Sequence, residues 1–323
     1  MKLDRRALLL GTAALTLSSP EARAQGLGSN PITIVVPFTP GTGIDILARA
    51  IGERLRVRWN QPVVIDNKPG ASGNIGAQAV AHAHPDGHTL LMTVNAFVMN
   101  PHLYKQMPYD PVANFAPIIE VAIGDLVLVT HPSLNVADVR ALVAAAKAAD
   151  GKIDYASPGV GTPQHLAMEL FKQKAGVSLN HVPYRGSAGA VQDVVAGHVK
   201  VMFMPVHTAL PFARANQIKV LAIGSAKRSS QAPDVPTLSE AGFPGAEVDL
   251  WYGLLAPGVT PDEIIAKLNA EVNQILHEPA LVETLRAQGL VAVGGTPQDF
   301  AKLIAADLAK WGAVVKGAKI SAD

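Results

Sequence analysis

The sequence predicts an α/β protein with two lobes and a site between them. Short runs rich in Val and Ile alternate with amphipathic stretches of helical period along the whole chain. Two glycine-bearing loops, at 37–43 and 157–162, each lie between a predicted strand and a predicted helix. No low-complexity linker divides the chain. Two lobes without such a linker imply that the chain crosses between them more than once, so that one lobe is discontinuous.

The first loop, Pro37-Phe38-Thr39-Pro40-Gly41-Thr42-Gly43, follows the predicted strand 32–36. The helix after it opens near Asp45, and its apolar residues have the spacing of one helix face. These residues are Ile44, Leu47, Ala48, Ile51 and Leu55. Such a loop exposes backbone N–H groups at the positive end of a helix dipole. It can therefore hold an anion without a basic side chain.

The second loop, Ser157-Pro158-Gly159-Val160-Gly161-Thr162, has the same setting. It follows a predicted strand at 153–157 and precedes a predicted helix at 163–175. Because the two loops lie far apart in the sequence, we expect each lobe to contribute one of them. The pair predicts a cleft that grips one small acid.

The remaining elements continue the alternation of strand and helix. We expect strands at 62–65, 88–93, 179–183, 199–204 and 218–224, a third glycine-rich loop at 68–74, and a helix at 187–196. A helix at 136–149 is predicted to start at an Asn135 cap and to end at Asp150-Gly151.

Two strand regions are expected to cross between the lobes, one at 117–130 and one at 248–255. The predicted lobes are therefore 31–127 together with 249–323, and 128–248. Thr260-Pro261-Asp262-Glu263 predicts a capping box at the start of one C-terminal helix, and Thr296 predicts the start of the last helix.

Composition excludes several classes of protein. The chain has 323 residues, a net charge of +1 and no long run of like charge, which argues against a nucleic-acid-binding protein that relies on a basic surface. It has no cysteine, so disulfides and a lipid-modified cysteine are excluded. No segment beyond the N-terminus is apolar enough to span a bilayer, so we expect a soluble mature protein.

The N-terminus is predicted to be a cleavable signal peptide over residues 1–24. Lys2, Arg5 and Arg6 precede a short apolar run at 7–17, and Ala22-Arg23-Ala24 forms a small-x-small cleavage site. Cleavage would remove four basic and two acidic groups and leave a mature net charge of −1. The Arg5-Arg6 pair also fits a twin-arginine signal, so the choice between the Sec and Tat routes stays open.

Motifs typical of enzymes are missing. The run from Gly41 to Ile46 lacks the third glycine of a dinucleotide-binding fingerprint, and the chain has no phosphate loop and no His-Glu-x-x-His. His82, His84 and His88 surround a Pro85-Asp86-Gly87 turn, and we expect no metal there. We therefore expect a binding protein without cofactor or metal, while an unmarked hydrolase or lyase stays an alternative.

An ordered set of short motifs runs through the mature chain. It comprises Val35-Val36-Pro37-Phe38-Thr39-Pro40-Gly41, Asn67-Lys68-Pro69-Gly70-Ala71-Ser72-Gly73-Asn74, Pro85-Asp86-Gly87, Pro108-Tyr109-Asp110-Pro111, Gly159-Val160-Gly161-Thr162, His181-Val182-Pro183-Tyr184-Arg185-Gly186 and Pro233-Asp234-Val235-Pro236-Thr237. This set resembles the Bug proteins, the receptors of tripartite tricarboxylate transporters.

The resemblance implies a periplasmic solute-binding protein with a two-lobed, type II-like Venus-flytrap fold. Such a protein closes on a small carboxylate and delivers it to membrane transporter subunits. We expect a monomer without nucleic-acid partners. Carried over by position, the ligand-binding residues are Phe38, Gly41, Thr42, Gly43, Asp45, Asn95, Ala96, Ser157, Gly159, Gly161, Thr162, His165, Tyr184, Gly186, Met204 and Pro205.

Two departures from the family pattern concern specificity. The usual Pro-Gly-Gly-Ser/Thr becomes Pro40-Gly41-Thr42-Gly43, and a frequent Asp-Asn becomes Met204-Pro205. The missing acid at 204 disfavours an amino-acid ligand, because a buried ammonium needs a partner. Trp251 and Tyr252 are expected to pack at the lobe junction rather than to contact ligand. A ligand sensor for a signalling receptor stays a second alternative.

Overall fold

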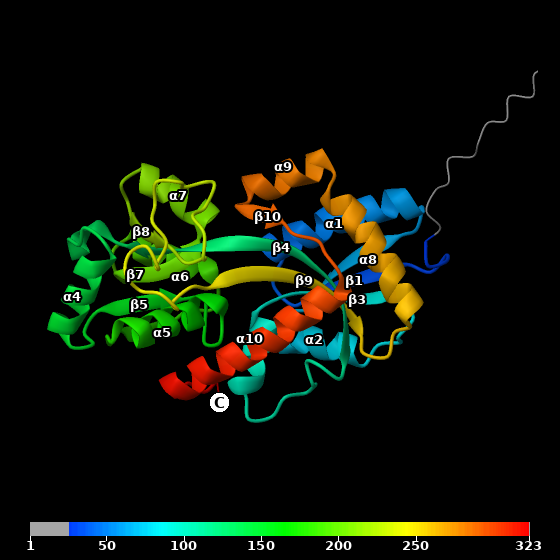
Figure 1. The fold of residues 1–323 in the computed structure, drawn as a ribbon, viewed down its shortest axis with the longest axis horizontal. Helices are drawn as coiled ribbons and strands as arrows, with labels where there is room; N and C mark the ends of the chain where they lie inside the picture. The colour runs from blue at the N-terminus through cyan, green and yellow to red at the C-terminus, as the bar shows by residue number, and fades with distance from the viewer. Residues whose placement is uncertain (1–25, 323) are drawn as a thin grey trace, which may run out of the picture.

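The computed structural model describes residues 26–322, so the predicted signal peptide at 1–24 lies outside the described residues. Two α/β lobes lie side by side, and two long strands, β4 (Phe115–Thr130) and β9 (Asp249–Pro257), run between them (Figure 1). The predicted α/β, two-lobed fold is confirmed.

One lobe is built on a mixed sheet at the N-terminal end of the chain. Strands β1 (Ile32–Val36), β2 (Val63–Asn67) and β3 (Thr89–Val94) run parallel in the order β2-β1-β3, and β9 joins β3 in the antiparallel direction. Strand β4 follows β9, and the short β10 (Leu290–Ala292) pairs with β4.

The other lobe repeats this plan on the second half of β4. Its strands are β5 (Asp154–Ser157), β6 (Asn180–Pro183), β7 (Val201–Pro205) and β8 (Lys219–Ile223). The order is β4-β7-β5-β6, and β8 also pairs with β4. Parallel strands β5, β6 and β7 end at the same edge of the sheet, so the loops after them gather there.

Helices cover the faces of the sheets. They are α1 (Gly43–Trp59), α2 (Asn74–Ala81), α3 (Ala96–Met99), α4 (Val139–Ala149), α5 (Pro163–Ala175), α6 (Ser187–Val195), α7 (Val206–Arg214), α8 (Asp262–Leu276), α9 (Pro279–Ala287) and α10 (Pro297–Ala318), with 3-10 turns at Ala71–Gly73, Asn100–His102 and Pro132–Leu134. The predicted inward face of α1 is buried at all five of its apolar positions.

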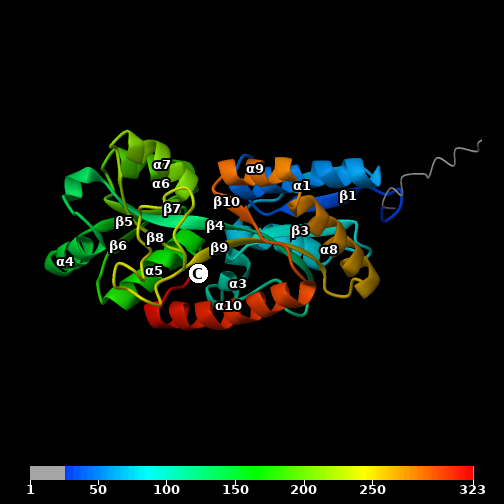
Figure 2. The same cartoon turned by 45° about the horizontal axis from the view of Figure 1, so that its top comes forward.

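Strand β4 changes partners part-way along its length. Residues 115–125 pair with β9, and residues 126–130 pair with β7 and β8. Helix α10 lies along one side of the molecule and spans both lobes (Figure 2). It contacts α5, where the side-chain amide of Gln173 donates to the carbonyl of Val314 at 2.8 Å. Two strands and one helix therefore connect the lobes.

Two predicted helix starts are wrong. Helix α4 is capped by Asp138, whose carboxylate accepts the N–H of Ala141 at 2.8 Å, whereas Asn135 ends the preceding 3-10 turn in a left-handed conformation. Helix α8 begins at Asp262, and the hydroxyl of Thr260 donates to Pro257 instead of capping the helix. The predicted Thr296 cap of α10 is confirmed.

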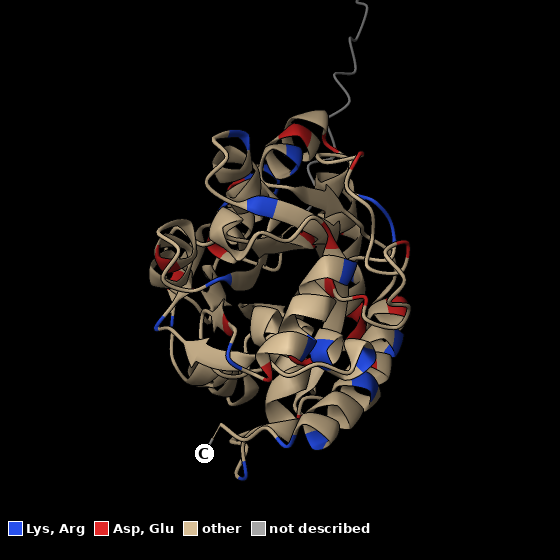
Figure 3. Cartoon of the chain, turned by 90° about the vertical axis from the view of Figure 1, so that its left-hand side faces the viewer, with Lys and Arg blue, Asp and Glu red and all other residues tan. Residues whose placement is uncertain are grey.

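Positions occupied by Lys or Arg and positions occupied by Asp or Glu are interspersed along the ribbon in Figure 3. Among residues 26–322, no helix is long and apolar enough to cross a membrane.

Candidate functional site

A cavity of about 580 Å³ lies between the lobes, at the ends of β1 and β5 where the two predicted glycine loops meet. Its walls come from both lobes and from crossing strand β9. The lining residues are Pro37, Phe38, Thr39, Thr42, Gly43, Ile44, Pro69, Gly70, Ala71, Ser72, Gly73, Val94, Pro158, Gly159, Thr162, Pro163, Gln164, Arg185, Gly186, Ser187, Pro205, Leu250 and Tyr252.

The N-termini of five helices converge on this cavity. The residues before α1, α2, α5, α6 and α7, which are Thr42, Gly73, Thr162, Gly186 and Pro205, all line it. Each helix N-terminus carries a partial positive charge from the aligned peptide dipoles, equivalent to about half an elementary charge. Five of them around one small volume make a site that favours an anion.

Backbone donors are free at the start of α1. Thr42 makes no side-chain cap, and no hydrogen bond among the described residues uses the N–H groups of Gly43 or Ile44. The hydroxyl of Tyr252 lies close by, because a Cβ on Gly43 would be 3.6 Å from it. Tyr252 is only 5% exposed, and its hydroxyl has no hydrogen-bond partner among the described residues. These three groups can donate to one bound oxygen atom or pair of atoms.

Arg185 is the one ionisable cation among the described residues that line the cavity, and no Asp or Glu lines it. Arg185 is an exposed residue and forms no ion pair with the described residues. The cavity wall therefore carries one unpaired positive charge in addition to the helix dipoles. A ligand ammonium group would meet no carboxylate there.

Seven of the sixteen predicted ligand-binding residues line the cavity. They are Phe38, Thr42, Gly43, Gly159, Thr162, Gly186 and Pro205. The other nine are not among the lining residues: Gly41, Asp45, Asn95, Ala96, Ser157, Gly161, His165, Tyr184 and Met204.

Several of these nine residues bond or pack within the protein instead of facing the cavity. The N–H of Gly41 donates to Asp45 at 2.9 Å. Asn95 is fully buried and donates to the carbonyl of Asp249 at 2.7 Å. The Tyr184 hydroxyl donates to Asp193 at 2.5 Å. Met204 is fully buried in the apolar core around β7.

Several residues that line the cavity were not predicted from the sequence, among them Ser72, Gln164, Arg185, Leu250 and Tyr252. The sequence positions of two of these residues could have indicated that they line the site. Ser72 lies in the third glycine-rich loop, and Arg185 directly precedes the predicted contact Gly186. Tyr252 was expected to pack at the lobe junction, and it does lie on crossing strand β9, but it also lines the cavity, with its hydroxyl beside Gly43.

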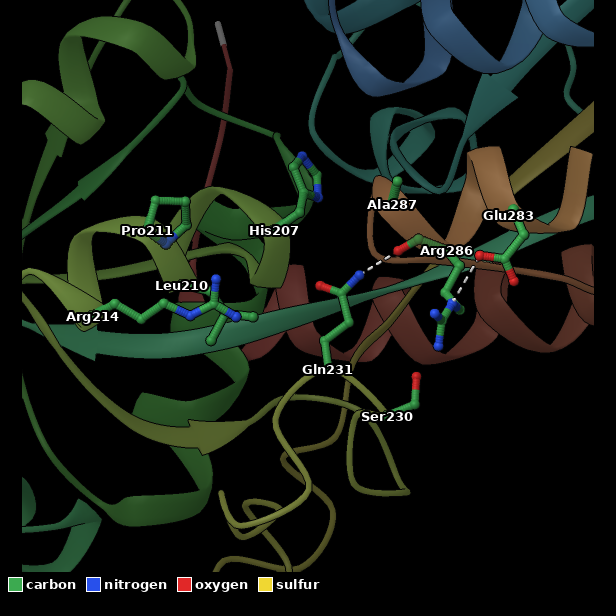
Figure 4. Close-up of a pocket in the computed structure, with 9 residues that line it drawn as sticks. All are labelled: His207, Leu210, Pro211, Arg214, Ser230, Gln231, Glu283, Arg286 and Ala287. Carbon is green, nitrogen blue, oxygen red and sulfur yellow. Dashed lines mark hydrogen bonds and ion pairs between the residues drawn. The ribbon is translucent and has the colours of Figure 1, made fainter. Parts of the chain in front are cut away.

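A second cavity, of about 450 Å³, lies between α7 and α9 (Figure 4). Its wall carries both signs of charge: Arg286 pairs with Glu283 at 3.4 Å, and the Gln231 amide donates to the Arg286 carbonyl. No glycine loop and no predicted site residue lines it. The cavity at the glycine loops is therefore the candidate ligand site.

Residues 47–320 match the family described as the tripartite tricarboxylate transporter family receptor. The chain belongs to this family. The predicted resemblance to the Bug proteins is thereby confirmed, since Protein BugT of Bordetella pertussis is 36% identical over 296 residues, covering 90% of this chain and 91% of that protein.

Two solved structures with more than 30% identity superpose closely on the chain. A structure described as R. palustris Rpa4515 with adipate has a TM-score of 0.83 at 37% identity and covers 90% of this chain and 98% of its own. MatC from Rhodopseudomonas palustris with bound malate has a TM-score of 0.80 at 31% identity and covers 88% and 99%. The two structures are described with adipate and with malate, both dicarboxylic acids, and the receptor family binds solutes rather than transforming them.

Proposed function

We propose that this protein is a periplasmic solute-binding protein that captures a small dicarboxylate and delivers it to the membrane subunits of a tripartite tricarboxylate transporter. The observation that supports it best is the convergence of five helix N-termini on a cavity without any acidic side chain. A carboxylate bound there gains from dipoles and from unpaired N–H groups.

The two ends of the ligand have different partners in this proposal. One carboxylate accepts hydrogen bonds from the N–H groups of Gly43 and Ile44 and from the Tyr252 hydroxyl. The other carboxylate approaches Arg185, which has no partner within the described residues. An α-amino acid is disfavoured, because its ammonium would be left unpaired in the cavity. The adipate and malate of the two similar structures fit this chemistry.

We also propose that the lobes divide at the predicted positions, with 31–127 and 249–323 in one lobe and 128–248 in the other, and that ligand closes them about β4 and β9. The change of partners along β4 between Asp125 and Leu126 supports this division. The sixteen predicted residues then act in two groups. Those on the wall contact the ligand, and those behind it hold the loops. A monomer exported by cleavage after Ala24 is sufficient for this role.

The test begins with mass spectrometry of small acids released from natively purified protein. Calorimetry then measures the affinity for adipate, malate, aspartate and hexanoate, and small-angle scattering measures the radius of gyration with and without the best ligand. We expect a dicarboxylate to bind most tightly and the radius to decrease. Tight binding of aspartate, or turnover of a bound acid, would contradict the proposal.

A further inference from the structure

The side chains of His165 and His181 contact the second glycine loop on the side away from the cavity. The N–H of Gly161 donates to Nδ1 of His165 at 3.1 Å. The hydroxyl of Ser157 lies 2.7 Å from Nε2 of His181 and accepts the N–H of Gly159 at 3.2 Å. Neither histidine lines the cavity, and His165 is only 3% exposed.

The first glycine loop has the same hydrogen bond from a glycine N–H to the side chain four residues on, and we call this bond the brace of the loop. The N–H of Gly41 donates to Oδ2 of Asp45, four residues along the chain, as the N–H of Gly161 donates to His165. The two glycines have nearly equal φ angles of +82° and +79°, in the left-handed region. A bond from a glycine N–H to the side chain four residues on therefore shapes both loops.

The threonine after each glycine completes the match. Thr42 and Thr162 are both extended helix N-caps, with φ of −76° and −72° and ψ of 160° and 154°. Each hydroxyl donates to the carbonyl three residues earlier, at 2.9 Å to Thr39 and 2.8 Å to Gly159. The two lobes thus present similar loops to the cavity. They differ in that the Thr162 hydroxyl also accepts the N–H of His165 at 3.4 Å, whereas Thr42 makes no side-chain cap.

The two acceptor side chains, Asp45 and His165, differ in charge. Asp45 carries a negative charge, which Arg49 balances at 3.0 Å, and Asn67 donates to the same carboxylate at 3.0 Å. His165 has no such partner and stacks on His181, with ring centroids 4.0 Å apart. Burial, together with His181 and Lys172, lowers the pKa of His165 to about 3, so the imidazole is neutral at neutral pH.

The other groups around this pair are balanced. Tyr155 stacks on His181 from β5, with centroids 4.8 Å apart, and its hydroxyl donates to Glu169 at 2.5 Å. Lys172 pairs with the same carboxylate at 2.6 Å. The neutral His165 acceptor thus lies near an ion pair, Lys172 with Glu169, whose charges oppose each other.

We propose that His165 is a positioning residue for the ligand anion: its neutral Nδ1 fixes the loop before α5 through the Gly161 N–H and adds no charge behind the site. The inference rests on the proposed function, because it assigns a role within the same anion site. An acidic acceptor at this place, without a counterpart of Arg49, would repel a bound carboxylate. Since Nδ1 accepts a hydrogen bond, the ring proton lies on Nε2.

The brace can be tested without any ligand. Nitrogen-15 NMR of the histidine-labelled protein at pH 7 should show His165 as the neutral tautomer with its proton on Nε2. Hydrogen exchange of the Gly161 amide should speed up at least tenfold in His165→Ala and stay slow in His165→Asn, whose amide oxygen can accept the same bond. A proton on Nδ1, or unchanged exchange in His165→Ala, would overturn the brace.

The effect on binding is then measured by calorimetry with adipate at pH 7. We expect His165→Ala and His165→Asp to bind about tenfold more weakly or worse, and His165→Asn to stay within about threefold of the parent protein. The exposed His277, on the far end of α8, supplies the control, since His277→Asp adds the same charge away from the cavity. Circular dichroism checks the fold of each variant.

The outcomes separate the two proposals. If the parent protein binds neither adipate nor malate, the proposed function fails, and the NMR experiment still decides the brace. If the parent binds adipate and His165→Asp binds equally well, a neutral acceptor is not required and the inference is wrong. If His165→Asn binds as poorly as His165→Ala while remaining folded, His165 acts through something other than the Gly161 bond.

Discussion

The hydroxyl of Ser72 donates to the carbonyl of Val160 at 3.0 Å, and this bond joins a glycine loop of one lobe to a glycine loop of the other. Ser72 lies at a left-handed φ of +52° in the turn before α2, which is an uncommon conformation for a residue other than glycine. The bond exists only when the two loops are close together, so it belongs to the arrangement in which the lobes approach each other across the cavity.

Ser72→Ala should therefore weaken ligand binding with little effect on stability. A single neutral hydrogen bond contributes about 0.5–1.5 kcal/mol, which corresponds to an affinity lower by about two- to tenfold. The measurement is calorimetry with adipate, and thermal unfolding of the ligand-free protein is the control. An unchanged affinity would mean that the ligand-bound state does not use this contact.

Gly161→Val should abolish binding while the fold survives. A Cβ on Gly161 would lie 2.7 Å from Cδ1 of Leu103 in the other lobe, and the φ of +79° disfavours a branched side chain. We expect the affinity for adipate to fall at least about a hundredfold, because the lobes cannot approach without moving the loop.

A matched glycine separates this clash from backbone strain. Gly176 also has a positive φ, +63°, but a Cβ there would meet nothing within 4 Å. Gly176→Val should lower the melting temperature through the same strain and leave adipate binding intact. If both variants lose affinity equally, the loss comes from strain and not from the contact with Leu103.

Arg185→Ala should discriminate between ligands with one and two carboxylates. Hydrogen bonds to charged groups contribute about 1.5–3 kcal/mol, so the affinity for adipate should fall by about ten- to a hundredfold. Hexanoate, which has a single carboxylate, should bind the variant and the parent protein alike. The control is Arg228→Ala, which removes an arginine paired with Glu240 at 2.8 Å and absent from the cavity wall. If both acids lose affinity equally, Arg185 binds the carboxylate that we assign to Gly43, Ile44 and Tyr252.

Stability should fall with rising pH because of Glu120, which lies on β4 between the lobes. Burial, and secondarily the charges of Asp249 and Asp307, raises the pKa of Glu120 to about 7. The folded state therefore holds a proton that the unfolded chain releases near its ordinary pKa of 4.5. Between these two values each rise in pH favours unfolding, so the contribution is most favourable below 4.5 and is lost above 7.

Glu120→Gln should remove this penalty. We expect the variant to be about 1–3 kcal/mol more stable than the parent at pH 8 and nearly equal to it at pH 4, below both pKa values. Urea unfolding at the two pH values measures the difference. If the difference in stability between variant and parent is the same at both pH values, folding does not raise the pKa of Glu120 and the prediction is wrong.

Local patterns in the sequence predicted the two loops and most of the helices, but they missed α3, α7 and α9 and misplaced the starts of α4 and α8. The apolar spacing from Ile44 to Leu55 predicts the buried face of α1, since residues three and four positions apart lie on the same face of a helix. The sequence likewise predicts that Thr42 and Thr162 lie at helix starts beside the cavity, because a glycine loop before a helix frees backbone donors. Family resemblance, read from ordered short motifs, predicted the two-lobed fold.

Which side of a loop a residue faces is decided by the tertiary structure. Gly159 and Gly161 are two positions apart and look equivalent in the sequence, yet Gly159 lines the cavity, whereas Gly161 donates to His165 and contacts Leu103 across the lobes. The direction of an N–H depends on φ and ψ and on the acceptor that folding brings beside it.

Residues that depend on long-range contacts could not be found from the sequence. Tyr252 is separated from Gly43 by more than two hundred residues, and only the pairing of β9 with β3 and β4 brings its hydroxyl to the first loop. What the sequence determined by itself is that two helix-capping loops can hold an anion. What the fold alone decided is which donors remain free to do so, because a backbone or side-chain group already bonded within the protein is not available to the ligand.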